Sequence, residues 1–439
     1  MAKITPFPGI RFNPDRVGNL AHVISPPYDK ISNPERKRLW NLDEHNVVKL
    51  ILPPPSDSDT DVMTQSTDSE SAEWYEEAAK RLREWQSQGI LKNDEPSLYV
   101  YHQTYTYKNV TLTRSGLFVA LQLEDNSGPH AHEHTFEGPK ADRLRLTRAA
   151  QANLSPIFLL GGGEENGWRD LFARATTPLV DFTDHEGHKH QLWALTGEDN
   201  LAGAKQFLED CDLVIADGHH RYETALNYRR EMLEKTGKKP ENEAWGYVLA
   251  LVVPLISEGL RVLPTHRVLR KLPEGGLQTI RDAFSQGGQV YPIANPSGEA
   301  IRALLGQEEN ANAIVMHTPD ETLLLRLKTD AQIPALESSQ PGIRELNVTI
   351  LHRFIFEDLL KLPADQLADH VRYIRGEEES IDMVSKGEGE AAFLMAGIPE
   401  QTVFEVSKKG LKMPQKSTDF YPKIPTGLLI RSAADSESS

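Results

Sequence analysis

The segment Asp217-Gly218-His219-His220-Arg221 is the densest group of residues that could do chemistry. It follows an apolar run, residues 213–216, and precedes a segment with helical spacing, so we expect it to join a buried strand to a helix. The first turn of a helix presents backbone N–H groups and the positive end of the helix dipole, which suit a phosphate. Gly218 would let the phosphate approach the backbone, while His219, His220 and Arg221 could donate hydrogen bonds to it. Asp217, at the end of the strand, could hold Mg²⁺.

The alternative for this segment is that Asp217 simply caps the helix and both histidines are solvated. Arg221 is expected to matter little for stability, because a cation at the N-terminus of a helix opposes the helix dipole. A residue that is unfavourable for the helix but suited to a phosphate therefore favours the phosphate-binding interpretation.

A second polar segment, His130-Ala131-His132-Glu133-His134, precedes Lys140 and Arg143. In one interpretation Glu133 is a general base, and Lys140 and Arg143 bind a phosphate. In another, the segment is extended, so that its three histidines share one face and bind a metal ion. In the third it is a polar surface loop.

The segment Met413-Pro414-Gln415-Lys416-Ser417-Thr418 could also contact a phosphate. Lys416 offers an ammonium group, and Ser417 and Thr418 offer hydroxyls. No G-x-x-x-x-G precedes these residues, so the segment is not a Walker loop. The alternative is a rigid loop with a solvated lysine.

Two smaller polar groups could line a substrate pocket. His266 and Arg267 follow a predicted strand, and Tyr28 and Asp29 lie in a proline-rich segment that is expected to form a fixed loop. Together with His132, these four residues are our candidates for contacts with the substrate.

The elements that must position these residues mix strands and helices without strict alternation. Alternating patterns predict strands over 97–107 and 110–123, helical spacing predicts a helix over 74–88, and a short apolar run predicts a strand over 47–52. The fold class is therefore α/β tending to α+β, with mixed sheets.

Changes in composition divide the chain into two parts. Residues 1–275 form an N-terminal part with the phosphate-binding core, and residues 276–431 form a C-terminal α+β part. Residues 53–72 are acidic and led by prolines, and are expected to form a mobile loop. The loop 413–427 could return to the site, and residues 432–439 are expected to be a disordered tail.

Charge and composition restrict the partners. The chain has 439 residues, with 48 Lys and Arg against 64 Asp and Glu, giving a net charge of −16. Such a surface would repel nucleic acids and anionic membranes, so we expect neither as a partner. The apolar run 247–256 is too short to cross a bilayer, and the N-terminal residues lack the apolar stretch of a signal peptide. With a single cysteine, Cys211, the sequence predicts a cytoplasmic protein and leaves the oligomeric state open.

Several motifs in order along the chain resemble one prokaryotic family, called domain of unknown function 1015. They are Pro26-Pro27-Tyr28-Asp29, His132-Glu133-x-Thr135, Lys140-x-Asp142-Arg143-Leu144, Ser155-Pro156-Ile157-Phe158, Ala216-Asp217-Gly218-His219-His220-Arg221-Tyr222, Pro264-Thr265-His266-Arg267 and Met413-Pro414-Gln415-Lys416-Ser417-Thr418.

The segment Asp217–Arg221 also resembles the phosphate-binding motif of ParB/sulfiredoxin-like nucleotide-using proteins, among them the free L-serine kinases. This resemblance implies a ParB/sulfiredoxin-like nucleotide-binding core, with the phosphates of ATP or ADP on His219, His220 and Arg221. It implies that Asp217 is the carboxylate on the Mg²⁺ or substrate side. The kinases use a separate glutamate to help deprotonate serine, and Glu133 is our choice for that base.

These observations favour a nucleotide- and Mg²⁺-dependent phosphotransferase that acts on a small hydroxyl substrate, with free L-serine converted to O-phosphoserine as the best guess. Phosphoryl transfer needs mainly positioning and charge neutralisation, which the Lys, Arg and His residues above could supply. Two alternatives stay open: a non-catalytic nucleotide-binding regulator, and a metal-dependent hydrolase that uses His130, His132 and His134.

Overall fold

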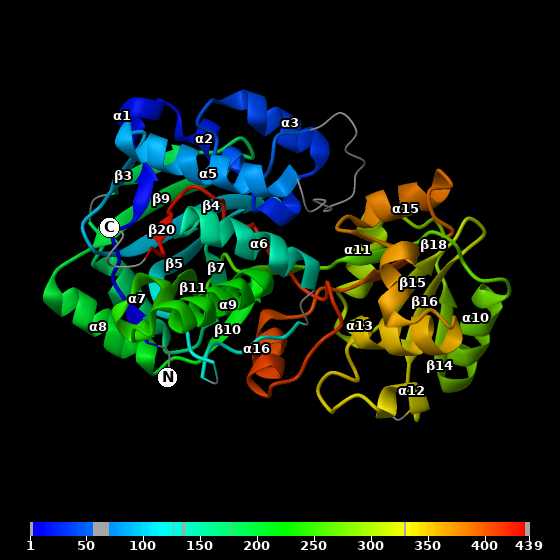
Figure 1. Ribbon diagram of the computed structural model, residues 1–439. Coiled ribbons are helices and arrows are strands. Elements are labelled where there is room, and N and C mark those ends of the chain that lie inside the picture. Colours follow the sequence, from blue (N-terminus) through cyan, green and yellow to red (C-terminus); the bar gives the residue numbers. More distant parts are fainter. Residues whose placement is uncertain are drawn as a thin grey trace. The chain divides into compact units, whose positions relative to one another are not determined.

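The computed structural model describes residues 3–55, 70–125, 127–133, 137–176, 178–328 and 331–434. The chain forms two compact units (Figure 1). Unit 1 comprises Met1–Ala131, Thr135–Leu260 and Pro422–Ser439, and unit 2 comprises His132–His134 and Arg261–Tyr421. The boundary between the units thus follows Leu260, whereas the sequence analysis placed a boundary after residue 275. The C-terminal segment belongs to unit 1.

Unit 1 is built on a mixed sheet that has eight strands in the described part of the chain. Its order is β10-β7-β11-β5-β4-β9-β8, with β1 also paired to β5. β7 and β11 are parallel, and the other pairs are antiparallel, which confirms the predicted α/β class with a mixed sheet. The strands are β1 (Ile4–Thr5), β4 (Leu98–Tyr107), β5 (Val110–Gln122), β7 (Ile157–Gly161), β8 (Val180–Thr183), β9 (Lys189–Leu195), β10 (Leu213–Asp217) and β11 (Tyr247–Pro254).

Three helices of unit 1, seen together in Figure 1, share a core with this sheet. They are α7 (Glu165–Ala173), α8 (Glu198–Glu209) and α9 (His219–Thr236). Trp168 of α7 and Leu208 of α8 pack in one apolar cluster with Ile157 and Leu159 of β7. This alternation along β7 leaves Phe158 on the other face of the sheet.

The remaining elements of unit 1 form a second core around α5. The helices are α1 (Pro14–Val17), α2 (Leu20–Val23), α3 (Asn33–Leu42), α4 (Val48–Ile51), α5 (Glu70–Ser87) and α6 (Glu137–Ala150), and the short turn η1 spans Tyr28–Lys30. Two small antiparallel pairs join distant segments: β2 (Ile10–Phe12) with β3 (Leu91–Asn93), and β6 (Ala152–Asn153) with β20 (Arg431–Ser432).

Unit 2 contains an antiparallel sheet with helices on both faces. Its order is β14-β16-β15-β18-β13-β17. The strands are β13 (His266–Leu269), β14 (Gly288–Pro292), β15 (Ile314–His317), β16 (Thr322–Leu327), β17 (Val371–Ile374) and β18 (Ala391–Met395). Ile280 and Phe284 of α10 (Gly276–Gly287) pack in one core with Leu269, whereas Ile301 of α11 (Gly298–Leu305) packs in another with Val268. A π-helix, η5 (Ile350–Leu359), covers the first of these two faces.

The other elements of unit 2 are short. β12 (Arg261–Leu263) pairs with β19 (Asp419–Tyr421). The helices are α12 (Pro334–Glu337), α13 (Asn347–Thr349), α14 (Leu367–His370), α15 (Glu377–Ser385) and α16 (Glu400–Lys408).

Two predicted segments differ at least in part in the structure, and a third lies mostly outside the described residues. The strand expected over 47–52 is the helix α4. In the segment 53–72, residues 56–69 lie outside the described residues, and Glu70 begins α5. In the expected tail 432–439, Ser432 lies in β20 and the N–H of Ala433 donates to the Gln151 carbonyl, while residues 435–439 lie outside the described residues.

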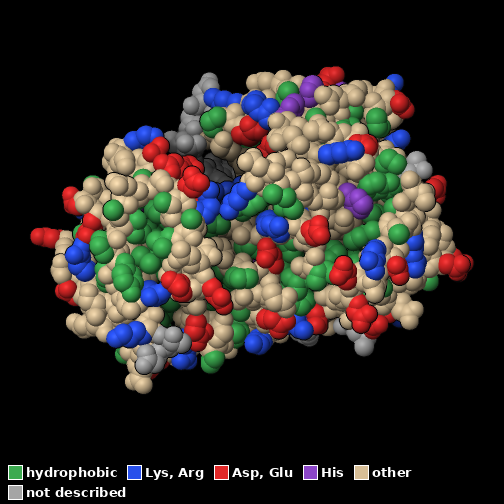
Figure 2. Space-filling view, turned by 180° about the vertical axis from the view of Figure 1, so that it is seen from behind, with side chains coloured by type: hydrophobic (Ala, Val, Ile, Leu, Met, Phe, Trp, Pro, Cys, Tyr) green, Lys and Arg blue, Asp and Glu red, His purple; other side chains and the backbone are tan. Residues whose placement is uncertain are grey.

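Two surface properties bear on the expected partners. Acidic and basic side chains are interspersed over much of the face shown in Figure 2. Among the described residues, no helix combines the length and the apolar character that a membrane span requires.

Candidate functional site

The turn between β10 and α9 has the strand–glycine–helix geometry that the sequence predicts. Asp217 is the last residue of β10, and α9 begins at His219. Between them Gly218 has a φ of 89°, in the left-handed region that a residue with a side chain adopts only at a cost. His219 is buried and His220 is half-buried.

Asp217 is the centre of a charged cluster within unit 1. Its Oδ2 lies 2.8 Å from Arg221 Nη2, and its Oδ1 lies 3.2 Å from Lys423 Nζ. Burial by itself would raise the pKa of Asp217, but the charges of Lys423, Arg221 and Lys30 outweigh it and hold this pKa well below its ordinary value. Asp217 is therefore ionised at neutral pH. Its oxygens accept from Arg221 and Lys423. Gly218, not Asp217, is the N-cap residue of α9.

Arg221 also has a structural role, contrary to the expectation from the helix dipole. Its Nη1 donates to the Pro156 carbonyl, just before β7, while Nη2 holds Asp217. A Cβ on Gly218 would lie 3.0 Å from the guanidinium carbon of Arg221, so the guanidinium packs directly on the turn. Only 13% of the Arg221 side chain is exposed. The negative charge of Asp217 offsets the positive charge of Arg221, which would otherwise oppose the dipole of α9.

The N-terminal residues predicted to line a pocket lie near this cluster. The Tyr28 ring centre is 4.3 Å from the guanidinium carbon of Arg143. Burial raises the pKa of Tyr28, and the charges of Arg143 and Arg221 act against that rise. Asp29 has a buried Oδ1 with no hydrogen-bond partner among the described residues.

The predicted phosphate-binding residues Lys140 and Arg143 already contact carboxylates. Lys140 Nζ lies 3.0 Å from Glu223 Oε2 on α9. Arg143 Nε donates to Asp142 Oδ2 at 2.6 Å, and its Nη1 donates to the Ile51 carbonyl at 2.8 Å. The charge of each is thus at least partly balanced within the protein.

A second cluster of predicted residues forms within unit 2. His132 Nε2 lies 3.0 Å from the Thr418 hydroxyl, and the Met413 N–H donates to the His132 carbonyl at 2.9 Å. Ser417, also in this loop, donates from its hydroxyl to the Pro414 carbonyl.

Arg267 connects this loop to β13. Its Nη2 donates to the carbonyls of Gln415 and Lys416, at 3.2 and 3.1 Å. Burial lowers the pKa of Arg267 to about 10, against the opposing effects of Tyr373 and Glu133. Lys416 has a φ of 56°, in the left-handed region of the backbone. Arg267 therefore binds the carbonyls of a segment whose backbone is left-handed at Lys416. The segment Met413–Thr418, His132 and Arg267 therefore lie together. Glu133 is close enough to affect the pKa of Arg267.

His266 lies elsewhere, although the sequence analysis grouped it with Arg267. Successive residues of a strand point to opposite faces of the sheet. His266 is fully buried, its Nδ1 accepts from the Met395 N–H at 3.3 Å, and its Nε2 lies 3.9 Å from Glu377 Oε1. The structure places it in the core of unit 2, not beside the loop.

The three histidines proposed as metal ligands are not shown as a cluster. His130 bridges to Val214 in unit 1, His132 belongs to unit 2, and His134 lies outside the described residues. Within the described ranges, no three His, Cys, Asp or Glu side chains are placed to hold a metal ion. Near Gly218, Asp217 offers one carboxylate, the kind of oxygen ligand that Mg²⁺ prefers, although its two oxygens already accept from Arg221 and Lys423.

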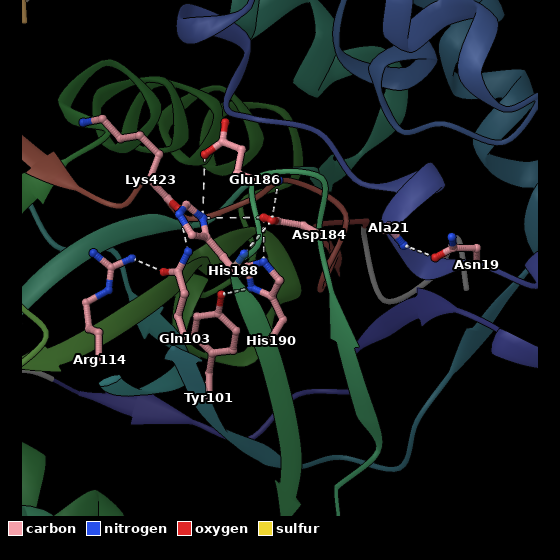
Figure 3. Close-up of polar contacts among 10 residues, drawn as sticks. All are labelled: Asn19, Ala21, Tyr101, Gln103, Arg114, Asp184, Glu186, His188, His190 and Lys423. Carbon is pink, nitrogen blue, oxygen red and sulfur yellow. Dashed lines mark hydrogen bonds and ion pairs between the residues drawn. The ribbon is translucent and has the colours of Figure 1, made fainter. Parts of the chain in front are cut away.

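Three residues beside Asp217 were missing from the predicted site: Lys423, Gln103 and Arg114. Gln103 Nε2 donates to the Lys423 carbonyl at 3.2 Å, and Arg114 Nη2 donates to Gln103 Oε1 (Figure 3). Lys423 lies in the loop 413–427, which the sequence analysis expected could return to the site. No local pattern marks Gln103 or Arg114, because each lies between other polar residues of its strand.

The structure thus defines an α/β protein with a charged strand–glycine–helix turn at the end of β10. The chain belongs to the family described as "Protein of unknown function (DUF1015)", whose model matches residues 4–349. This confirms the family that the motifs indicated. A search of curated proteins gave no match.

Solved structures with some similarity include three proteins. A conserved hypothetical protein from Pyrococcus furiosus is 14% identical, with 72% of this chain and 95% of that chain covered and a TM-score of 0.35. A free serine kinase in complex with AMP is 13% identical, with 71% and 92% covered and a TM-score of 0.36. SbnI with a C-terminal truncation, from Staphylococcus aureus, is 11% identical, with 72% and 88% covered and a TM-score of 0.35. At these values the similarity does not extend to function.

Proposed function

We propose that this protein is a nucleotide- and Mg²⁺-dependent phosphotransferase that acts on a small hydroxyl substrate. One observation carries the proposal: the ionised Asp217 carboxylate is surrounded by the positive charges of Lys423, Arg221 and Lys30 at the N-terminus of α9. Cations, helix N–H groups and a left-handed glycine suit a phosphate group on this turn.

The chemistry follows from charge neutralisation. Phosphoryl transfer develops negative charge on the phosphate oxygens, and positioned cations stabilise it. In this proposal Arg221 and Lys423 divide their hydrogen bonds between Asp217 and the phosphates, and Asp217 would hold the Mg²⁺ ion that accompanies ATP or ADP. Mg²⁺ would neutralise charge on the transferred group.

Free L-serine is the first acceptor to test, because the segment Asp217–Arg221 resembles the motif of the free L-serine kinases. Asp217 itself is a poor general base, since its pKa lies well below the ordinary value. Another group must remove the hydroxyl proton, and Glu133 stays our predicted base.

The test is an assay of purified protein with ATP or ADP, Mg²⁺ and L-serine, followed by mass spectrometry for O-phosphoserine. We expect a Mg²⁺-dependent product that Asp217→Asn reduces by at least tenfold, because the variant loses the charge that orders Lys423 and Arg221. A panel of other hydroxyl compounds covers a different acceptor. Folded wild-type protein that phosphorylates none of them with either nucleotide would contradict the proposal.

A non-catalytic nucleotide-binding regulator is the second candidate. It is favoured by the finding that the charged turn is complete within unit 1, because a regulator needs the phosphate site but no general base. Glu133→Gln separates the two functions. A kinase loses turnover and keeps its affinity for nucleotide, whereas a regulator shows no turnover in either form.

A further inference from the structure

Arg114, in the middle of β5, is a buried cation with few partners. Only 1% of its surface is exposed, and its guanidinium carbon lies 5.0 Å from the ring centre of Phe158. Nη2 donates to Gln103 Oε1, while Nε and Nη1 are buried without a hydrogen-bond partner among the described residues. Within the same ranges, the hydrogen-bond partner of the guanidinium is thus a neutral amide and not a carboxylate.

Such an arrangement is energetically costly. Burial lowers the pKa of Arg114 to about 10, against the opposing effects of Tyr101, Tyr105 and Asp217, so the guanidinium stays protonated at neutral pH. A buried charge is normally compensated by an opposite charge or by a full set of hydrogen bonds. Arg114 has neither within the described structure, and this is the pattern expected when a ligand supplies the partner.

Another buried arginine of unit 1 shows the contrast. Arg431 is also buried and lies 5.8 Å from an aromatic ring centre, that of Tyr247. It donates to the Tyr247 carbonyl at 3.0 Å, to the Ala244 carbonyl at 2.7 Å and to Asn153 Oδ1 at 3.3 Å. Both terminal nitrogens of Arg431 therefore have acceptors and only its Nε is buried without a partner, whereas Arg114 leaves both Nε and Nη1 without one. Arg431 serves as the matched control for Arg114.

Arg114 is linked to the cluster at Asp217 in two ways. Asp217 is close enough to act electrostatically on Arg114. The two residues are also joined through Gln103, which donates to the Lys423 carbonyl, and through Lys423, whose Nζ contacts Asp217 (Figure 3 shows Arg114, Gln103 and Lys423). All four residues belong to unit 1.

We infer that Arg114 is the receptor for an oxyanion of the ligand that binds beside Asp217. The oxyanion is either a phosphate of the nucleotide or the carboxylate of an amino-acid acceptor. These two candidates rest on the proposed function. Both present oxygens that take charge-assisted hydrogen bonds from a guanidinium. Arg114 would thus add a subsite to the charged turn.

The experiment compares the wild type with Arg114→Met, Arg114→Lys and Arg431→Met by calorimetric titration and thermal melting. The probes are ADP, inorganic pyrophosphate and L-serine at constant ionic strength. Arg114→Met should weaken binding of at least one probe by tenfold or more, and its Tm should be unchanged or higher, because a costly buried charge is gone. Arg114→Lys should recover part of the affinity, since it keeps the charge without the planar fork. Arg431→Met should lower the Tm and change affinity less than twofold.

The pattern of losses identifies the oxyanion. Weaker binding of both ADP and pyrophosphate assigns Arg114 to the phosphates, whereas weaker binding of L-serine alone assigns it to the carboxylate. If Arg114→Met and Arg114→Lys both bind every probe as the wild type does, the inference is overturned while the proposed function stands. If affinity falls as expected but no hydroxyl compound is phosphorylated, the proposed function fails and the inference stands. A wild type that binds none of the probes contradicts both.

Discussion

The guanidinium of Arg221 bonds both a carboxylate on its own turn and a carbonyl that precedes another strand. The Pro156 carbonyl comes just before β7, and Asp217 ends β10, its antiparallel neighbour. A charge-assisted hydrogen bond of this kind contributes about 1.5–3 kcal/mol when its partners are shielded from water. Arg221 therefore holds together the backbone that a phosphate would contact.

Replacing Arg221 should consequently affect both folding and binding. We expect Arg221→Ala to lower the free energy of unfolding by about 1–3 kcal/mol, and to weaken ADP binding by tenfold or more. Arg221→Lys should restore only part of each, since an ammonium group cannot reach both oxygens in one plane. Denaturant unfolding and calorimetric titration measure the two effects. Unchanged unfolding together with normal ADP affinity would show that neither contact matters.

At the scale of residues, the sequence predicts the charged residues of the turn itself, but it does not predict the distant residues that lie close to them. Asp217, Gly218 and Arg221 are adjacent, so their types and order reveal a strand–glycine–helix turn with charged groups. Arg114 and Lys423 are far from them in the chain. Their partnership depends on which strands are neighbours, and no local spacing specifies that order.

At the scale of elements, long periodic patterns predict well and short apolar runs do not. The alternation over 97–107 and 110–123 corresponds to β4 and β5, and the helical spacing over 74–88 corresponds to α5. The run 47–52 is apolar without a usable period, so it fits a buried helix as well as a strand, and it forms α4.

The strand β13 was not predicted. The sequence analysis placed His266 and Arg267 after a strand, and they do follow β12, but they also begin an inner strand of the unit 2 sheet. Here the contacts made in the folded protein, and not the polar pattern of the sequence, determine where these two side chains lie. Arg267 is held by loop carbonyls and by His352 Nε2, and His266 accepts from the Met395 N–H.

His266 should make the stability of unit 2 depend on pH. Burial lowers its pKa to about 4, against an ordinary value of 6.5, although Glu377 opposes that shift. Between these values the unfolded chain binds a proton that the folded protein does not. The free energy of unfolding should therefore fall as pH falls from 6.5 towards 4, by up to about 3 kcal/mol from this one residue. Denaturant unfolding of the wild type and His266→Gln between pH 4 and 7 measures the difference.

A matched control lies on the same strand. Val268→Ala removes buried apolar atoms and lowers stability at every pH, but it adds and removes no titratable group. Its unfolding free energy should keep the wild-type dependence on pH, whereas that of His266→Gln should become flatter. Equal slopes for the wild type and His266→Gln would rule out His266 as the titrating group.

At the scale of the whole molecule, unit 1 is discontinuous. Residues 422–439 return to it after the chain has passed through unit 2. In this segment β20 pairs with β6, Ile430 bridges to Ile10, and Thr426 bridges to Ser25. The sequence analysis expected that the loop 413–427 could return to the site, but it did not assign residues 422–439 to unit 1, because these contacts join residues that are hundreds of positions apart.

Removing residues 422–439 should therefore affect unit 1 selectively. The truncated chain loses Lys423 from Asp217, the hydrogen bonds of Arg431 and the β20–β6 pair. We expect faster hydrogen exchange in β7, β10 and the first turns of α9, together with a loss of ADP binding of tenfold or more. The strands β15 and β18 should exchange as in the full chain, because their pairing involves only unit 2.

Two further variants separate the contribution of Lys423 from that of the rest of the C-terminal segment. Deleting only residues 435–439 leaves β20 and Lys423 in place, so exchange and ADP binding should match the full chain. Lys423→Met in the full chain keeps the backbone contacts of the segment and removes one cation from Asp217, so ADP binding should weaken while β7 keeps its protection. If the chain that ends at residue 421 protects β7 and β10 normally, the C-terminal segment is not what holds the charged turn in place, and the turn must be stable through Arg221 and the sheet alone.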